Sequence, residues 1–227
     1  MIPWYRSADG HPLIIPSPGQ FVVLRLQPKP NGAPLLRNYS LSGAPRADRY
    51  RVSVKLEPNG AASTYLDVQT KVGDVLDVTA PRGSFTLRPG SGPVVLLSAG
   101  VGATPVMAML HALVSENSQR EVWWLFGARD RKDHPFAEES RNLLKALAHS
   151  KSYIGYSRPG PSDRQGADYD GPGRLGVTVL DHSTEFPRFR PCSHTAKPRC
   201  VKRIVRCQSR AVASSPAETG GRRITLR

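Results

Sequence analysis

The chain has 227 residues, 39% of them hydrophobic, and a formal net charge of +14, which fits one or two globular domains. It has no apolar run near the ~20 residues of a membrane span and no signal-like N-terminus, so we expect a cytoplasmic protein. Residues 183–227 hold eleven Lys and Arg against two Glu, or +9, which leaves +5 for residues 1–182. The main part is thus only mildly basic, and we expect no nucleic-acid partner.

The first 90 residues have the pattern of an antiparallel β-barrel. Short strand-like runs are separated by Pro-Gly, Asn-Gly and Arg-Gly turns. The segment 60–66 is helix-like and opens after Pro58-Asn59. The strand-like runs are residues 21–26, 37–42, 50–55 and 75–79. Before them stands only Trp4-Tyr5-Arg6, a poor strand, so we expect the first strand of the barrel to be missing.

Residues 91–182 alternate strands with helices, which predicts a doubly wound α/β domain with a parallel sheet. The predicted strands are residues 93–97, 121–128, 152–156 and 175–180. One helix follows the first strand, with Thr104 as N-cap and Pro105 as its first residue. Residues 134–149 form the other. Ligands of such sheets bind beyond the carboxyl ends of the strands.

A glycine turn joins the first of these strands to its helix, at Gly100-Val101-Gly102. A helix N-terminus offers free N–H groups, and glycine lets a phosphate come close to the backbone. The full dinucleotide fingerprint is absent because its third glycine is missing. Taken alone, the turn fits an ordinary strand-to-helix connection equally well.

A second candidate cluster lies in the barrel at Arg37-Asn38-Tyr39-Ser40. An arginine can bind a diphosphate through two parallel hydrogen bonds, and a tyrosine offers a flat face to an aromatic ring. Arg37 and Tyr39 are two residues apart on a strand and share a face, whereas Ser40 faces the other way. The alternative is a surface arginine beside a half-buried tyrosine. Similarly, Gly60 and Ser63 either contact an anion or cap a connecting helix.

The combined motifs resemble the ferredoxin–NADP reductase superfamily, above all the reductase domains of flavohaemoglobins and of bacterial oxidoreductases that carry a MOSC domain. The resemblance covers roughly residues 10–182. Its motifs are Arg37-x-Tyr39-Ser40-x-Ser42, Val54-Lys55, Gly60-x-x-Ser63-x-x-Leu66 and Gly100-x-Gly102-x-Thr104-Pro105.

This resemblance implies that the barrel binds FAD. Arg37 would bind the pyrophosphate, Tyr39 would pack on the isoalloxazine ring, and Ser40 would bond near N5, which makes Tyr39 and Ser40 the candidate catalytic residues. The further candidate flavin contacts are Ser42, Val54 and Lys55, with Gly60 and Ser63 at the pyrophosphate. The Gly60-Ala61-Ala62-Ser63 segment is more similar to FAD users than to FMN users.

For the second domain, the resemblance implies NAD(P)H, with its nicotinamide meeting the flavin ring. Gly100, Gly102, Thr104 and Pro105 would line the nicotinamide and its phosphates. Ser157 and Arg158 resemble the 2′-phosphate contacts of NADPH users, with help from Arg129, although Pro159 departs from that pattern.

Such proteins pass hydride from NAD(P)H to FAD and electrons onward to an iron–sulfur protein, a haem protein or a fused domain. The cofactors carry this chemistry, so no side chain need be a strong acid or base. We therefore interpret His111, His134 and His149 as residues of helix surfaces or helix ends.

Residues 183–227 form an irregular basic tail, and we expect this stretch to be disordered or translated out of frame after a shift near 181–186. The spacing of its cysteines, Cys192, Cys200 and Cys207, fits neither a zinc site nor an iron–sulfur cluster, so we expect no metal. Two alternatives to an active reductase follow. One is a truncated fragment that binds no cofactor, and the other is nucleic-acid binding through the tail.

Overall fold

The computed structural model describes residues 4–175 and 222–226 of the chain. They belong to two compact units. The first unit comprises Met1–Pro89, Thr104–Asn117 and Pro216–Arg227, and the second comprises Gly90–Ala103 and Ser118–Ser215.

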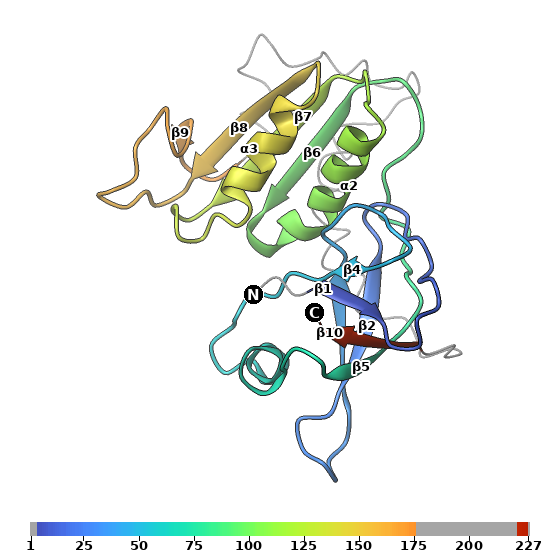
Figure 1. The fold of residues 1–227 in the computed structure, drawn as a ribbon. Coiled ribbons are helices and arrows are strands. Elements are labelled where there is room, and N and C mark those ends of the chain that lie inside the picture. Colours follow the sequence, from blue (N-terminus) through green and yellow to red (C-terminus); the bar gives the residue numbers. More distant parts are fainter. Residues whose placement is uncertain (1–3, 176–221, 227) are drawn as a thin grey trace, which may run out of the picture. The chain divides into compact units, whose positions relative to one another are not determined.

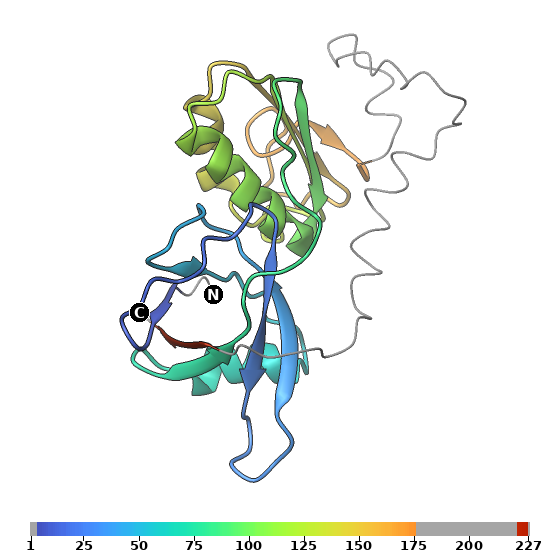
Figure 2. The same ribbon diagram turned by 90° about the vertical axis from the view of Figure 1, so that its right-hand side faces the viewer.

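The first unit is built on a six-stranded sheet whose neighbouring strands are antiparallel, in the order β3-β2-β5-β10-β1-β4. Strands β2 and β3 run side by side to a projecting loop (Figures 1 and 2). The strands are β1 (Trp4–Ser7), β2 (Phe21–Leu26), β3 (Leu35–Ser40), β4 (Tyr50–Arg51), β5 (Val75–Val78) and β10 (Arg222–Leu226).

Alternation along β2 creates the core of this unit. Val22, Leu24 and Leu26 are all 0% exposed, because every second side chain of a strand points to the same face. Burying each contributes about 1.5–3 kcal/mol. A short helix, α1 (Ala61–Thr64), continues into a π-helical turn, η1 (Tyr65–Gln69), which adds buried Leu66 to the same core. The helix-like segment that the sequence predicted is therefore present.

Two strands of this sheet differ from the sequence predictions. We expected no strand at the start of the chain, yet Trp4–Ser7 form β1, where Tyr5 is buried. We also expected an irregular tail, yet Arg222–Leu226 form β10, which pairs with β1 and with β5. Ile224 is 0% exposed there. The rest of the predicted tail, and with it the frame-shift hypothesis, falls on residues 176–221 and 227, outside the described residues.

The second unit is a parallel sheet in the order β6-β7-β8-β9. One helix, α3 (Ala137–Lys145), lies against a face of this sheet (Figure 1). Residues 122–127 of β7 are all buried, as expected for a central parallel strand. The strands are β6 (Val94–Ala99), β7 (Val122–Ala128), β8 (Ser150–Tyr156) and β9 (Gly171–Pro172). Residues 176–180 of the last predicted strand lie outside the described part.

The helix boundaries are partly different from those predicted. Thr104 is not the N-cap, because the chain first forms a 3₁₀ turn, η2 (Gly100–Gly102), and α2 then runs from Ala103 to Ser115. Pro105 lies in the first turn of α2, where its missing N–H has no intrahelical acceptor. The second helix starts at Ala137 rather than 134, after Phe136 in the left-handed region at φ 60°.

Strand β10 generates a prediction about stability. Replacing Ile224 with Ala should lower the free energy of unfolding of the first unit by about 2–4 kcal/mol, because a buried side chain is lost from the sheet core. Urea unfolding monitored by circular dichroism measures this. Thr225→Ala, at the half-buried neighbouring position, serves as the control and should change stability by well under half as much. Equal stability of both variants would show that residues 222–226 do not belong to the sheet.

Candidate cofactor-binding sites

Arg37 and Tyr39 lie on β3, at one end of the strand order, and share a face because they are two residues apart. Tyr39 is half-buried and packs against the core. Arg37 is exposed, and its Nη1 donates a hydrogen bond of 2.8 Å to the carbonyl of Leu36. Within the described part of the chain, no carboxylate forms an ion pair with this guanidinium. Its other N–H donors can therefore bind a phosphate.

The electrostatics of Tyr39 suit a packing role. Burial raises the pKa of its phenol above the ordinary value, and the positive charge of Arg37 lowers that pKa only in part. The phenol is therefore neutral at pH 7 and can donate a hydrogen bond or support an aromatic ring. Ser40 is half-buried, lies opposite Phe21 and occupies the other face of β3, as the sequence predicted.

Ser42 lies inside the first unit rather than at its surface. It is 0% exposed, and its Oγ is 2.7 Å from that of Ser53. The buried guanidinium of Arg51 donates to Ser42 Oγ at 3.2 Å and also bonds the Ser42 carbonyl, while Arg51 lies over the Trp4 ring at 5.5 Å. Sequence analysis missed this network. The alternation of apolar Tyr50, Val52 and Val54 predicts an outward face for Arg51, whereas the structure buries residues 50–54 without alternation.

Val54 and Lys55 follow on the same segment. Val54 is buried and belongs to the core cluster. Lys55 is exposed, and its ammonium lies 3.3 Å from a carboxylate oxygen of Glu57. An exposed pair of this kind contributes little to stability, so the ammonium is free to exchange this partner for a phosphate.

Gly60 and Ser63 shape the start of α1. Ser63 Oγ donates to the Gly60 carbonyl at 3.1 Å and accepts a hydrogen bond from the backbone N–H of Glu57 at 3.2 Å. A Cβ on Gly60 would lie 2.5 Å from Ser63 Oγ, so this close approach requires glycine. The serine hydroxyl thus holds the loop. Its contact with a pyrophosphate stays a prediction.

The glycine turn follows the carboxyl end of β6. Gly100 has φ +52°, a left-handed conformation that glycine adopts without strain. No heavy atom lies within 4 Å of where its Cβ would be, so the backbone angle rather than crowding requires glycine. Gly102 ends η2, and Thr104 and Pro105 are buried in the first turn of α2. The predicted strand–turn–helix geometry is present.

The ends of β7 and β8 are joined by backbone hydrogen bonds beyond the strands. Ser157 N donates to Ala128 O at 3.0 Å, and Arg158 N donates to Arg129 O at 2.8 Å. The structure therefore brings the three residues predicted here to one edge of the sheet. Arg129 pairs with Asp133 at 2.9 Å. Arg158 is exposed, and in the described residues no carboxylate forms an ion pair with it.

His134 behaves differently from the sequence prediction. It is not on a helix surface but in the loop before α3, where it is only 8% exposed. Its Nδ1 lies 2.9 Å from the hydroxyl oxygen of Tyr156. Burial and the nearby charge of Arg141 lower the pKa of His134 to about 4, against a smaller opposing effect of Asp168. Nothing in the local sequence marked this histidine as a core residue.

Two further observations concern the described residues only. They contain no group of three or more His, Cys, Asp or Glu arranged to hold a metal ion. None of their helices combines the length and the apolar character that crossing a bilayer requires.

Comparison with known proteins identifies the two units. Residues 10–87 match the family described as oxidoreductase FAD-binding domain, and residues 96–194 match the oxidoreductase NAD-binding domain. A flavohemoprotein from Deinococcus radiodurans is 39% identical over 163 residues, which are 72% of this chain and 40% of that protein. The chain spans less than half the length of the curated flavohemoproteins it matches.

Solved structures agree with these matches. The FAD/NAD-binding domain of nitric oxide dioxygenase from Vibrio cholerae is 34% identical with a TM-score of 0.70, over 78% of this chain and 73% of that chain. A flavohemoglobin from Malassezia yamatoensis with bound FAD and heme is 26% identical with a TM-score of 0.68, over 81% and 45% respectively.

The fold and the matches define an oxidoreductase with an FAD-binding domain followed by an NAD-binding domain. The chain belongs to the ferredoxin–NADP reductase superfamily. The predicted order of an antiparallel barrel-type domain and a parallel α/β domain is confirmed, as are the predicted FAD-binding and NAD-binding domains.

The neutral, buried His134 predicts a pH dependence of stability. Its folded pKa of about 4 lies below the ordinary 6.5, so the unfolded chain takes up a proton first as the pH falls. Stability should therefore decrease between about pH 6.5 and pH 4 and not change further from this group below pH 4.

Urea unfolding near pH 7.5 and near pH 5 measures this effect. Wild type should lose about 2 kcal/mol more than His134→Phe over this interval, because the variant has no imidazole to protonate in the unfolded state. Equal losses in the two proteins would contradict a buried neutral imidazole.

Proposed function

We propose that this chain is the reductase module of an electron-transfer protein, which takes hydride from NAD(P)H onto flavin N5 and passes electrons to a haem, iron–sulfur or other acceptor. The observation that carries the proposal is the order of two features in one chain. Arg37, which is exposed and has no ion pair with a carboxylate of the described residues, lies in the part that matches FAD-binding domains. The left-handed Gly100 turn lies in the part that matches NAD-binding domains.

Arg37 is the residue best suited to the flavin pyrophosphate. Its planar guanidinium can make two parallel hydrogen bonds to phosphate oxygens. It needs to release only the carbonyl of Leu36 to do so. Lys55 adds a further donor, and Gly60 and Ser63 at the start of α1 are proposed to lie at the pyrophosphate, while buried Ser42 and Val54 support these segments from within the core.

Tyr39 and Ser40 are proposed to orient the flavin ring. Bound FAD supplies the atom that accepts hydride and the capacity to deliver electrons one or two at a time. The protein's part is to fix distance and angle and to exclude water. Because the Tyr39 phenol is neutral at pH 7, it can pack against an aromatic ring without acting as a base.

The pyridine nucleotide is proposed to bind along the carboxyl edge of the parallel sheet, where ligands of open α/β sheets bind. Gly100, Gly102, Thr104 and Pro105 would line the nicotinamide and its phosphates. Ser157 and Arg158, helped by Arg129, would contact a 2′-phosphate, which favours NADPH. The absence of an ion pair to Arg158 within the described residues supports this preference.

A haem acceptor is favoured by the relatives. The crystal structure of the flavohemoglobin from Malassezia yamatoensis contains bound FAD and heme, and this chain matches 45% of that protein. We propose that the electrons leave the flavin for a haem group on a fused domain or a separate protein.

Removing the Arg37 side chain tests the flavin site. Arg37→Ala should weaken FAD binding roughly 10- to 100-fold, since charged hydrogen bonds contribute about 1.5–3 kcal/mol each. Flavin content after gel filtration and titration of the stripped protein with FAD measure the loss. The matched control is Arg25→Ala, on β2, where the arginine is exposed but paired with Asp77 at 3.2 Å. Retention of full FAD affinity by Arg37→Ala would rule out the assigned role.

A bulky residue in the glycine turn tests the nucleotide site. Gly102→Val should block NAD(P)H and leave FAD content unchanged, because the added methyl groups obstruct the backbone that the phosphates approach. Reduction of the bound flavin is measured with NAD(P)H and, separately, with dithionite. Dithionite reduces any bound flavin without the nucleotide site, so the comparison separates loss of NAD(P)H binding from loss of FAD. Gly92→Val is the control, since its Cβ would point into open space. Normal flavin reduction by NAD(P)H in Gly102→Val would contradict the phosphate-binding turn.

A further inference from the structure

His134 connects two neighbouring strands of the parallel sheet, although it belongs to neither. Its ring stacks on Phe126 of β7, with centroids 4.6 Å apart and an angle of 17°. Its Nδ1 lies 2.9 Å from the hydroxyl oxygen of Tyr156 at the end of β8. All three side chains are at most 8% exposed. One imidazole therefore contacts both strands near their carboxyl ends.

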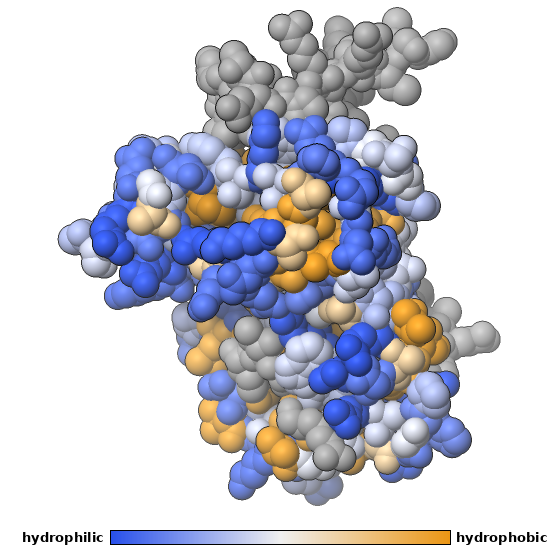
Figure 3. Space-filling model, turned by 45° about the horizontal axis from the view of Figure 1, so that its top comes forward, coloured by the Kyte–Doolittle hydropathy of each residue, from blue (hydrophilic) through white to orange (hydrophobic). Residues whose placement is uncertain are grey.

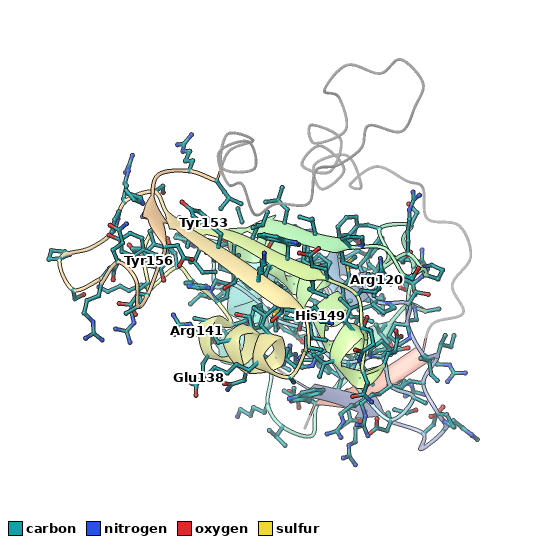
Figure 4. All side chains as sticks on the ribbon, turned by 90° about the horizontal axis from the view of Figure 1, so that it is seen from above. Arg120, Glu138, Arg141, His149, Tyr153 and Tyr156 are labelled. Carbon is teal, nitrogen blue, oxygen red and sulfur yellow. The ribbon has the colours of Figure 1, made fainter. Side chains whose placement is uncertain are left out.

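The residues that make these contacts directly precede, in the sequence, those proposed to bind the nucleotide. Phe126 precedes Gly127-Ala128-Arg129, and Tyr156 precedes Ser157-Arg158. The backbone bonds between the two strand ends keep them in register beyond the sheet. Figure 4 shows Tyr156 at the end of β8 and Arg141 on α3. A shift of Tyr156 would move Ser157 and Arg158 with it.

The hydrogen bond between Tyr156 and His134 is the one that each side chain makes in the described residues. The Tyr156 hydroxyl is buried, and its partner there is His134 Nδ1. Either atom can be the donor, because the proton of a neutral imidazole can lie on Nδ1 or on Nε2. Nε2 is itself buried without a partner in the described part of the chain.

The surroundings keep the imidazole neutral. Arg141 from α3 disfavours a second positive charge, and burial acts in the same direction, while Asp168 opposes them. Arg141 donates to the carbonyl of Ala167 at 2.9 Å, which holds the loop that carries Asp168 and Tyr169. Tyr169 stacks on the ring of Tyr156 with centroids 4.9 Å apart. Tyr156 is thus held by His134 at its hydroxyl and by Tyr169 at its ring.

We propose that His134 is a positioning residue for the pyridine nucleotide: through its hydrogen bond with the Tyr156 hydroxyl and its stacking on Phe126, it holds the ends of β7 and β8 in the arrangement that binds the cofactor's phosphate and ribose groups. This inference rests on the proposed function. It assigns to a residue outside the binding surface the task of keeping Ser157 and Arg158 in place, which spares the nucleotide the cost of ordering them.

The test measures nucleotide binding without hydride transfer. NAD⁺ and NADP⁺ are titrated by calorimetry into the FAD-loaded full chain, as wild type and as Tyr156→Phe. The variant keeps the ring and its stacking and loses only the hydroxyl. The dissociation constant of the better-binding nucleotide should rise roughly 3- to 10-fold, the factor expected for one buried hydrogen bond. FAD content should change little, and the thermal midpoint should fall by a few degrees, because a buried hydrogen bond is lost.

Two further variants distinguish positioning from general packing. Tyr169→Phe also removes a hydroxyl from the same stack, but its phenol has no hydrogen bond in the described residues, so nucleotide affinity should be unchanged. His134→Phe keeps the stacking and removes the hydrogen-bond partner of Tyr156, so it should weaken binding as Tyr156→Phe does. The double variant His134→Phe/Tyr156→Phe should be no weaker than either single variant, because both remove one interaction.

The outcomes separate the inference from the proposed function. Failure of wild type to bind either nucleotide would overturn the proposed function and the inference with it. Nucleotide binding by wild type and Tyr156→Phe within twofold of each other would overturn only the inference. An equal loss in Tyr169→Phe, or strictly additive losses in the double variant, would also overturn it, because the effect would then be general packing.

Discussion

A pyrophosphate bound at a protein surface must be met by N–H donors that no nearby carboxylate has already neutralised, and this requirement shapes both units. On β3 the proposed donor is Arg37, an exposed guanidinium that donates to the neighbouring carbonyl of Leu36. After β6 the proposed donors follow the left-handed Gly100, where the chain turns through η2 into α2. Charged hydrogen bonds of this kind are among the strongest that a side chain makes.

The parallel sheet supplies rigidity for that second set of donors. Strand β7 is buried along nearly its whole length, so its end is fixed by packing before any ligand binds. The loops beyond the strands gain order from local contacts, of which the His134–Tyr156 hydrogen bond is the most deeply buried. The space-filling view (Figure 3) shows hydrophilic side chains around a smaller apolar area on one face of the molecule.

Local patterns were enough to predict much of this arrangement. The alternation of residues 21–26 and the apolar run of residues 121–128 each fix a strand through side-chain periodicity alone. The glycine turn was also predictable from the sequence. Its helix starts at Ala103, one residue before Thr104, because Gly100–Gly102 form a 3₁₀ turn. Strands β1 and β10 were not predictable in the same way. Each is short, and each is stabilised by pairing with partners far away in the sequence, so tertiary context decides their state.

The candidate site shows the same division between local and distant information. Arg37 and Tyr39 were predicted to share a face because a strand places alternate residues on one side, and both lie on β3; their contacts with the flavin stay a prediction. Ser42 has the same residue type as a ligand-binding serine, yet its hydroxyl is used inside the core by Ser53 and Arg51. The burial of His134 was not predicted, because its hydrogen-bond partner, Tyr156, lies on β8, 22 residues further along the chain. Contacts of this kind are visible only once the strands are paired.

The most direct test of the account is anaerobic titration of the purified, FAD-loaded chain with NADH and with NADPH while the absorbance of oxidised flavin is recorded. The account predicts a yellow protein whose flavin absorbance is bleached by about one equivalent of nucleotide, because each NAD(P)H delivers one hydride to one flavin. A protein that retains no FAD, or one whose bound flavin is reduced by dithionite but by neither nucleotide, would contradict it.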